Sequence, residues 1–524
     1  MQRLTGADAT FLYAQTRTSH FEIASVLVLD PSTAAGSVDL ATTRQYLSDR
    51  LHLVPFLRRR LVRIPLGLDH PRWIEDPDFD LAYHLREAAL AGPGTDAQLA
   101  EFVADLMSRP LDQTRPLWEC HLVSGLAGGR MASIIKVHHA AVDGVAGFDS
   151  LASLVDLAPD SPPPAPPAVA WRADREPAEL DLLVGAVSHL ALQPFRAVAT
   201  TRRLLTKAVA SRRSSHGGAA VLSTPGAPST PFNTAVTPHR RVQFVDIPMA
   251  DLAAVKEHVG TTLNDVVLAV VGGALRRYLQ RTGRAPQAQL QSFVPLSTRT
   301  GAGSANDANL TTALYVGLHT DVADPVDRLR AIAHSSAEAK ARYAEFGPAT
   351  LTDITELGGA PGGVVMAKAM DLLRLNERVR LGANVVVSNI PGPPIPLFIN
   401  GAKVERMYPV GPVADGNALN VTLISYEGSM GFGLCADRTA VPDLADLADD
   451  LRASADELIA LTRTTPVPAP APVTTRPAAK RDARRSAPAT HRAAGRRPER
   501  TARPPAASPT TNTSLAETPA SDGR

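Results

Sequence analysis

Apolar and polar residues alternate along the chain in two distinct ways, which predict strands in some segments and helices in others. In the first half, β-branched and apolar residues predict strands over 20–30, 115–123 and 131–139, and helical spacing predicts helices over 41–54 and 95–111. In the second half, the strand-like segments are 240–249, 290–297, 309–319, 383–394 and 418–437, and residues 251–280 predict a long helix. Each half has its own strands and helices, so we expect two mixed sheets with covering helices.

Breaks in composition divide the chain into four parts. Clustered prolines at 159–171 exclude both a helix interior and a central strand, and an amphipathic helical segment with basic residues towards its end follows at 180–213. From about Thr465 the chain is rich in Pro, Ala, Thr and Arg and lacks core-forming residues, so it cannot offset the entropy of folding. The predicted parts are an N-terminal subdomain (1–158), a proline-rich crossover with the helical segment (159–238), a C-terminal subdomain (239–464) and a disordered tail (465–524).

Charge and cysteine content exclude several classes of protein. The 54 basic and 52 acidic residues give a net charge of +2, which lacks the strong positive field of a general nucleic-acid binder. Two cysteines, Cys120 and Cys435, have no CxxC spacing, which predicts small core residues in a reducing, cytoplasmic compartment. The N-terminus lacks a secretory apolar segment, and the most apolar windows are short or interrupted, so we expect no transmembrane helix.

Two adjacent histidines stand where a predicted strand ends. His138 and His139 follow the apolar run 131–137, and Gly144 permits a turn soon after. Adjacent strand residues point to opposite faces, so only one histidine can face a given cavity, and the other is better placed as a structural partner. Histidine suits general-base chemistry near neutral pH. Asp143 could fix the imidazole, or it could pair with an arginine and hold the loop.

The sequence allows other interpretations of this pair. A histidine pair alone is more typical of surface or packing residues. A metal site needs three or four ligands, and neither HxH nor HExxH occurs nearby, so we expect no metal. The GxSxG turn of a serine hydrolase is also missing from the sequence, which argues against that class.

Taken together, His138, His139, Asp143 and Gly144 form the pattern HHxxxDG, which resembles the signature of the coenzyme-A-dependent acyltransferase superfamily. That superfamily includes chloramphenicol acetyltransferase, carnitine acyltransferases and peptide-synthetase condensation domains. Five further segments are similar to the bacterial wax ester synthase/diacylglycerol acyltransferase family: LTGADATFLYAQTRTSHFEI, PLWECHL, TLNDVVLAVVGGALR, SNIPGPP and DGNALNVTLISYEGSMGFGLCADR. The resemblance runs from the N-terminus to about Leu461.

The resemblance implies an α/β (α+β) fold with two chloramphenicol-acetyltransferase-like subdomains and an active site in a tunnel between them. It implies that His139 is the general base, without a covalent acyl-enzyme, and that His138 and Asp143 support the geometry. Asn264 is the candidate oxyanion donor, although Thr261, Thr262, Asn264 and Asp265 could instead cap a helix. The candidate substrate-binding residues are Gly144, Ser388, Asn389, Pro391 and Gly392, whereas Pro116, Leu117 and Trp118 are expected to be packing residues.

The implied activity is transfer of a long-chain acyl group from acyl-CoA to diacylglycerol or a fatty alcohol, which yields triacylglycerol or wax esters. Acyl-CoA is a co-substrate, and no bound cofactor is expected. The motif itself does not encode the acceptor, so an enzyme for a polyketide, sugar or peptide acceptor and a catalytically silent lipid-binding protein remain alternatives. We expect a cytoplasmic protein with peripheral contact at the inner face of the plasma membrane or at lipid droplets, through the segment 182–213. The alternative for this segment is an ordinary covering helix of a soluble domain.

Overall fold

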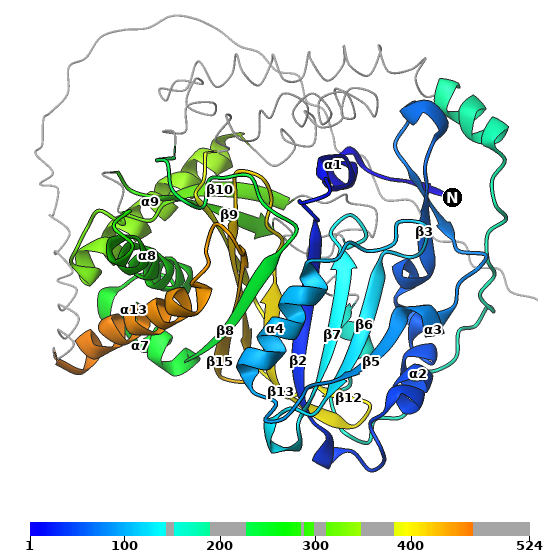
Figure 1. Cartoon of the computed structure of the whole chain (residues 1–524), viewed down its shortest axis with the longest axis horizontal. Helices are drawn as coiled ribbons and strands as arrows, with labels where there is room; N and C mark the ends of the chain where they lie inside the picture. The colour runs from blue at the N-terminus through cyan, green and yellow to red at the C-terminus, as the bar shows by residue number, and fades with distance from the viewer. Residues whose placement is uncertain (143–150, 189–226, 285–287, 298–310, 347–381, 465–524) are drawn as a thin grey trace, which may run out of the picture. The chain divides into compact units, whose positions relative to one another are not determined.

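Two six-stranded sheets form the frame of the part of the chain that the computed structural model describes (Figure 1). The described residues are 1–142, 151–188, 227–284, 288–297, 311–346 and 382–464. Both sheets combine parallel and antiparallel pairs and both carry helices, as the hydrophobic pattern predicted. The predicted tail lies outside the described residues, and the predicted crossover is described only at 159–188 and 227–238.

The first sheet carries the histidine pair. Its strand order is β12-β13-β2-β7-β6-β5, and only the β5–β6 pair is parallel among these strands. The bounds are β2 Glu22–Asp30, β5 Leu85–Ala89, β6 Trp118–Ser124, β7 Met131–His138, β12 Phe398–Ile399 and β13 Ala402–Val410. Apolar residues of β2 and β7 alternate between the two faces, so the sheet is covered on both sides.

Two of these strands come from the second half of the chain. Residues 398–410, which fall within the predicted C-terminal subdomain, form β12 and β13 at the edge of the first sheet, where β13 pairs with β2. The strand β13 also packs against β14 (Leu419–Tyr426) and β15 (Ser429–Asp437) of the second sheet. The two halves are therefore interleaved at this edge, which the order of elements along the sequence did not indicate.

The second sheet has the order β10-β9-β11-β14-β15-β8. Its remaining strands are β8 Arg240–Pro248, β9 Gln291–Ser297, β10 Thr311–Gly317 and β11 Val385–Ile390. The pairs β9–β11 and β11–β14 are parallel and the others are antiparallel. Helices α7 (Met249–Val259), α8 (Leu263–Arg281), α9 (Pro325–Phe346) and α13 (Leu444–Thr464) gather on one side of this sheet (Figure 1).

The remaining elements belong mainly to the first half. They are β1 Gln2–Arg3, α1 Gly6–Ala14, α2 Leu40–Ser48, β3 Arg59–Val62, β4 Arg72–Glu75, α3 Leu81–His84 and α4 Asp96–Met107, with β1, β4 and β3 forming a small third sheet. Helix α4 packs between the two large sheets, against β2 and β8, and its apolar residues share one core with both (Figure 1). The core is thus continuous from one sheet to the other.

The predicted single helix over 251–280 is wrong. Gly260 adopts a left-handed conformation (φ 76°) that ends α7, and Thr262 then caps α8 in a reciprocal capping box with Asp265. The two helices are bent by 102° relative to each other. In the described part of the chain no single helix is long and apolar enough to cross a membrane, and only this bent pair reaches that length and composition together.

Candidate functional site

The imidazole of His138 is held in one orientation inside the protein. It lies at the end of β7, and its side chain is only 1% exposed. The backbone N–H of Ala140 donates to Nδ1 at 3.1 Å, and Nε2 lies 3.1 Å from Oε1 of Gln15. Because a backbone N–H can only donate, Nδ1 is the acceptor and the proton is on Nε2. Burial lowers the pKa of His138 to about 3, with smaller contributions from His139, His20 and Lys136.

His139 has a different environment, one residue beyond the strand. Its ring is half-buried and stacks on Phe11 of α1, with centroids 4.1 Å apart and an interplanar angle of 21°. Its backbone N–H donates to the carbonyl of Phe21 at 2.8 Å. Burial lowers the pKa of His139, opposed in part by its own backbone carbonyl. His139 is therefore neutral at pH 7, as a general base must be before it accepts a proton.

The segment between α1 and β2 connects the histidines to the second half of the chain. The guanidinium of Arg240, at the start of β8, donates to the carbonyl of Thr18, and the backbone N–H of Asp415 donates to Oγ of Ser19 at 3.2 Å. The carbonyl of Phe21, a few residues further on, holds the backbone of His139. Contacts from the second half thus fix the segment against which His139 is placed.

A buried ion pair lies beside His138 on the same sheet. Glu22 of β2 is the register partner of His138, and Lys136 of β7 is two residues before it. The Lys136 ammonium lies 2.8 Å from Oε2 of Glu22 and donates to the carbonyl of Leu106 in α4 at 3.0 Å. Oε1 of Glu22 accepts from the backbone N–H of Leu111 at 2.6 Å. The pair joins β2, β7 and the end of α4 under the histidines.

Asn264 lies in the first turn of α8, but it is not the helix cap. Thr262 and Asp265 make the capping contacts. The capping role that the sequence allowed for this segment therefore belongs to these two neighbours of Asn264. Asn264 instead accepts a hydrogen bond through Oδ1 from Nδ2 of Asn389 at 3.5 Å. The structure therefore brings together two predicted site residues from α8 and β11 that are 125 positions apart in the sequence.

The run from Ser388 to Gly392 follows β11 into the adjoining loop. Ser388 and Asn389 lie in the strand, paired in parallel with Thr422 and Leu423 of β14. A Cβ added to Gly392 would lie 2.0 Å from the backbone oxygen of Ser425, and its N–H donates to the Ser425 hydroxyl at 3.1 Å. The close approach at Gly392 is to β14, so packing alone requires glycine here. Pro391, just before it, is exposed.

Other predicted residues are placed as follows. Asp143 and Gly144 lie outside the described residues. Leu117 and Trp118 are buried, and the Trp118 indole donates to the carbonyl of Leu57 at 2.7 Å, which confirms that they pack. Both cysteines are buried, as predicted. Within the described ranges, no group of three or more His, Cys, Asp or Glu is arranged to hold a metal ion.

Sequence reasoning missed the residues that surround the histidines. Phe11, Gln15 and Phe21 lie near the N-terminus, and Gln113 lies between α4 and β6. All four are far from the histidines in the sequence, and the fold brings them into the site. Gln113 donates through Nε2 to Oε1 of Gln15 at 2.6 Å. The separation of 98 residues between the two glutamines gives no local signal of this contact.

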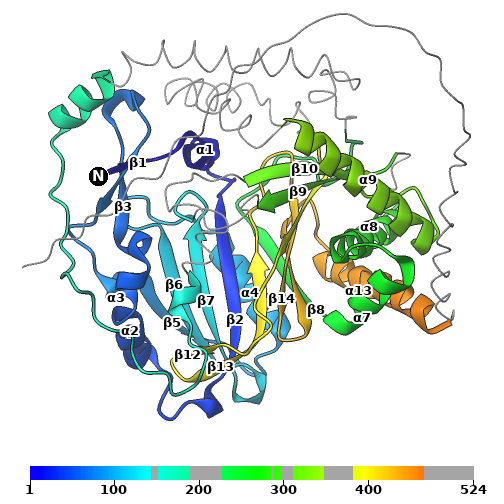
Figure 2. The same cartoon turned by 180° about the vertical axis from the view of Figure 1, so that it is seen from behind.

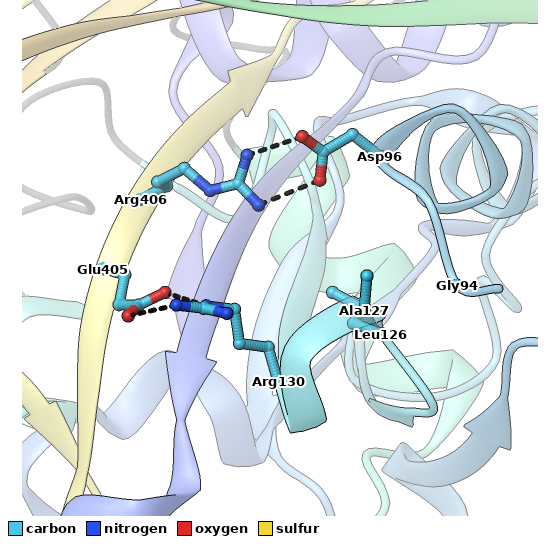
Figure 3. A pocket seen from close by; sticks show the side chains of 7 residues that line it. All are labelled: Gly94, Asp96, Leu126, Ala127, Arg130, Glu405 and Arg406. Carbon is cyan, nitrogen blue, oxygen red and sulfur yellow. Dashed lines mark hydrogen bonds and ion pairs between the residues drawn. The ribbon is translucent and has the colours of Figure 1, made fainter.

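A polar pocket of about 480 Å³ lies at the opposite end of β7 (Figure 3). Two ion pairs line it: Arg406 holds Asp96 through two hydrogen bonds of 2.7 and 2.9 Å, and Arg130 holds Glu405. The hydrogen bonds from Arg406 hold the pKa of Asp96 below its usual range. Arg130 precedes Met131, so the pocket is roughly 23 Å along the strand from His138. It contains none of the predicted site residues.

Family models, related sequences and solved structures all match this chain to the same group of proteins. Residues 4–267 match the wax ester synthase/diacylglycerol acyltransferase catalytic domain, and residues 308–459 match the C-terminal domain of the same family. A Mycobacterium tuberculosis (strain H37Rv) protein, provisionally named diacylglycerol O-acyltransferase, is 35% identical over 473 residues, which cover 89% of this chain and 99% of the relative. A second protein of that strain with the same provisional name is 33% identical over 461 residues, covering 88% and 90%.

Two solved structures show the same arrangement. The wax ester synthase/diacylglycerol acyltransferase from Marinobacter aquaeolei VT8 superposes with a TM-score of 0.62 at 30% identity, covering 88% of this chain and all of that one. The first condensation domain of the calcium-dependent antibiotic synthetase superposes with a TM-score of 0.53, covering 89% and 99%. Its identity is 19%, so this second likeness concerns the fold alone.

Proposed function

The chain belongs to the wax ester synthase/diacylglycerol acyltransferase family, and from this we propose that it transfers a long-chain acyl group from acyl-CoA to diacylglycerol or a fatty alcohol. The observation that carries the proposal is the environment of His139, a half-buried, neutral imidazole directly after β7. The products are triacylglycerol or wax ester and free coenzyme A. We further propose that both substrates meet in a tunnel between the two subdomains, with acyl-CoA as a co-substrate.

In the mechanism that we propose, Nε2 of His139 takes the proton from the acceptor hydroxyl as the oxygen attacks the thioester carbonyl carbon. The tetrahedral intermediate then collapses, and the carbon–sulfur bond breaks. The imidazolium returns the proton to the departing thiolate, so the histidine ends the cycle neutral and no covalent acyl-enzyme forms. The stacked Phe11 limits rotation of the imidazole ring, and the hydrogen bond from the backbone N–H of His139 to the carbonyl of Phe21 fixes the backbone that carries it. Asp143 keeps its proposed supporting role, as does Gly144 in substrate binding.

Asn264 is the proposed donor to the oxyanion. The hydrogen bond from Asn389 occupies its Oδ1 and orients the amide, and we propose that its Nδ2 group donates to the oxyanion. An N–H donor is what the developing negative charge requires. Asn389 then acts by orienting Asn264, and Ser388, Pro391 and Gly392 shape the adjoining strand end and loop.

The acceptor is tested by supplying the purified full chain with oleoyl-CoA and an equimolar mixture of dioleoylglycerol and hexadecanol, then resolving the lipid products and following free thiol. We expect triacylglycerol or wax ester to accumulate in proportion to thiol release. Thiol release without either lipid product would point to a different acceptor class. Binding of oleoyl-CoA without any thiol release would show a silent lipid-binding protein.

We also propose peripheral contact with a lipid surface, and a cytoplasmic location at the inner face of the plasma membrane or on lipid droplets. Residues 179–188 form a helix, drawn beside the β3–β4 hairpin in Figures 1 and 2, that buries Leu182 and Ala186 against the hairpin's apolar residues. Its other face exposes Leu180 and Val184 at 70% and 63%, and Leu66, at the hairpin tip with φ 59°, is 89% exposed. Beside these apolar side chains the outer face exposes Glu179 and Asp181, so the helix presents both apolar and acidic groups. The exposed apolar side chains favour contact with an apolar medium.

This surface contact is tested by co-sedimentation with vesicles of phosphatidylcholine containing diacylglycerol. Replacement of Leu180 and Val184 by serine should lower the bound fraction several-fold. The matched control is Leu157→Ser, which changes an equally exposed leucine, at 67%, elsewhere on the chain. Equal binding by both variants and the parent would contradict this placement of the surface.

A further inference from the structure

A chain of four hydrogen bonds connects a surface arginine to the histidine motif. The Arg63 guanidinium donates to Oε1 of Gln113, and Nε2 of Gln113 donates to Oε1 of Gln15 at 2.6 Å. Nε2 of His138 bonds the same Gln15 oxygen at 3.1 Å, and Nδ1 of His138 accepts from the backbone N–H of Ala140 at 3.1 Å. These residues come from the β3–β4 hairpin, the loop after α4, the end of α1 and the end of β7.

Both ends of this chain can only donate, which fixes the direction of every bond between them. A guanidinium has no acceptor, so Gln113 must present its oxygen to Arg63 and therefore its NH₂ group to Gln15. The Ala140 N–H likewise requires an unprotonated Nδ1, so His138 carries its proton on Nε2. The two donations meet at one atom, Oε1 of Gln15. A carbonyl oxygen has two lone pairs, and both are used here.

We propose that Gln15 and Gln113 are positioning residues, which hold His138 in its Nε2–H tautomer and thereby fix the backbone turn that carries His139. This inference rests on the acyl-transfer function proposed above. The turn closes around the His138 side chain, because the Ala140 N–H bonds its Nδ1 and the Ala141 N–H bonds its backbone carbonyl at 2.9 Å. His139 is the residue between these anchors. A change in the His138 tautomer would set two donors, Nδ1–H and the Ala140 N–H, against each other.

Two single substitutions with the same change of charge distinguish this role from a general structural or electrostatic one. In Gln15→Glu the shared atom remains an acceptor, so His138 and Gln113 keep their partner. In Gln113→Glu the donor is replaced by an acceptor of the same size that faces Oε1 of Gln15. Rotation of the Gln15 amide would relieve that contact only by placing its NH₂ group against the Nε2–H of His138. The Arg63 guanidinium still has an oxygen partner, so we expect Gln113→Glu to fold.

The experiment compares the parent, Gln15→Glu and Gln113→Glu by steady-state kinetics with oleoyl-CoA and dioleoylglycerol, and by ¹⁵N NMR of the histidine rings. We expect Gln15→Glu to retain the Nε2–H signature of His138, because the substituted side chain still accepts there, and to lose less kcat than Gln113→Glu. We expect Gln113→Glu to lose kcat by about tenfold or more, with little change in KM, together with a changed His138 signature, because a favourable hydrogen bond is exchanged for a repulsive contact. The His138 signal is assigned with His138→Gln.

Equal losses of kcat in the two variants would overturn the proposal, as would an unchanged His138 tautomer in Gln113→Glu. The NMR readout does not depend on turnover. If the parent shows no acyl transfer but the His138 tautomer responds as predicted, the proposed function fails, while the proposed direction of the four hydrogen bonds is supported. If the parent is active but the tautomer does not respond, the positioning role fails alone.

Discussion

Replacement of Lys136 by methionine should lower the free energy of unfolding by about 3–5 kcal/mol, because Glu22 would keep a buried charge without its cation. Lys136 and Glu22 are 0% and 1% exposed, so water cannot replace the lost partner. Methionine matches the length of the aliphatic stem but provides none of the ammonium donors. The carbonyls of Leu106 and Arg109 would also lose their donor, and the loss falls directly beside His138.

The measurement is urea denaturation at pH 7, followed by tryptophan fluorescence, for the parent, Lys136→Met and the double variant Lys136→Met/Glu22→Gln. Glutamine can still accept from the Leu111 N–H through its oxygen while removing the charge. The double variant should therefore be more stable than Lys136→Met alone, by about 1–3 kcal/mol. A loss below about 1 kcal/mol in Lys136→Met, or a double variant less stable than the single one, would refute the buried-pair reasoning.

Three further predictions concern the histidines and the β11 loop. The pKa of His138 is about 3 in the folded protein and near 6.5 in the unfolded chain. As the pH falls below 6.5, the unfolded chain therefore binds a proton that the folded protein does not. This lowers the free energy of unfolding by at most about 1.4 kcal/mol per pH unit. Urea titrations at pH 7, 6 and 5 should show that His138→Gln removes this part of the slope, and an unchanged slope would contradict it. The lowered pKa of His139 should place the acidic limb of the kcat/KM profile below pH 6.5, whereas an inflection above pH 7 would exclude His139 as the free base. Gly392→Ala should cost about 1–3 kcal/mol in urea denaturation because its Cβ meets the Ser425 backbone, and full stability would show that the loop can shift.

The sequence predicted the strands and helices best where one periodicity continues without interruption. The runs that became β2, β7 and α4 were identified because their apolar positions follow one spacing from end to end. The helix over 251–280 was predicted as one because both parts share that spacing, although Gly260 and the Thr262 capping box mark the break. The pattern does not predict a strand over 402–410, and the addition of these residues to the first sheet depends on pairing with β2, where Lys403 pairs with Asp30, 373 positions earlier (403 − 30).

The candidate site shows the same limit more clearly. The motif predicts roles for His138 and His139 because imidazole is one of the few side chains that titrate near neutral pH. Neither Gln15 nor Gln113 carries such a signal, and their role follows only from three segments meeting at one oxygen atom. The sequence around Asn264 is equally consistent with a helix cap. The structure shows that Thr262 makes the cap and that Asn264 pairs with Asn389.

The most direct test of the central claim is the rate of ester formation by His139→Ala. With oleoyl-CoA and dioleoylglycerol or hexadecanol, the parent should release one thiol for each ester formed. His139→Ala should lose about 10²–10⁴-fold in kcat, the usual contribution of a general base, with an unfolding free energy close to that of the parent. Ester formation by the folded His139→Ala variant at the parent rate would contradict the assignment of His139 as the base.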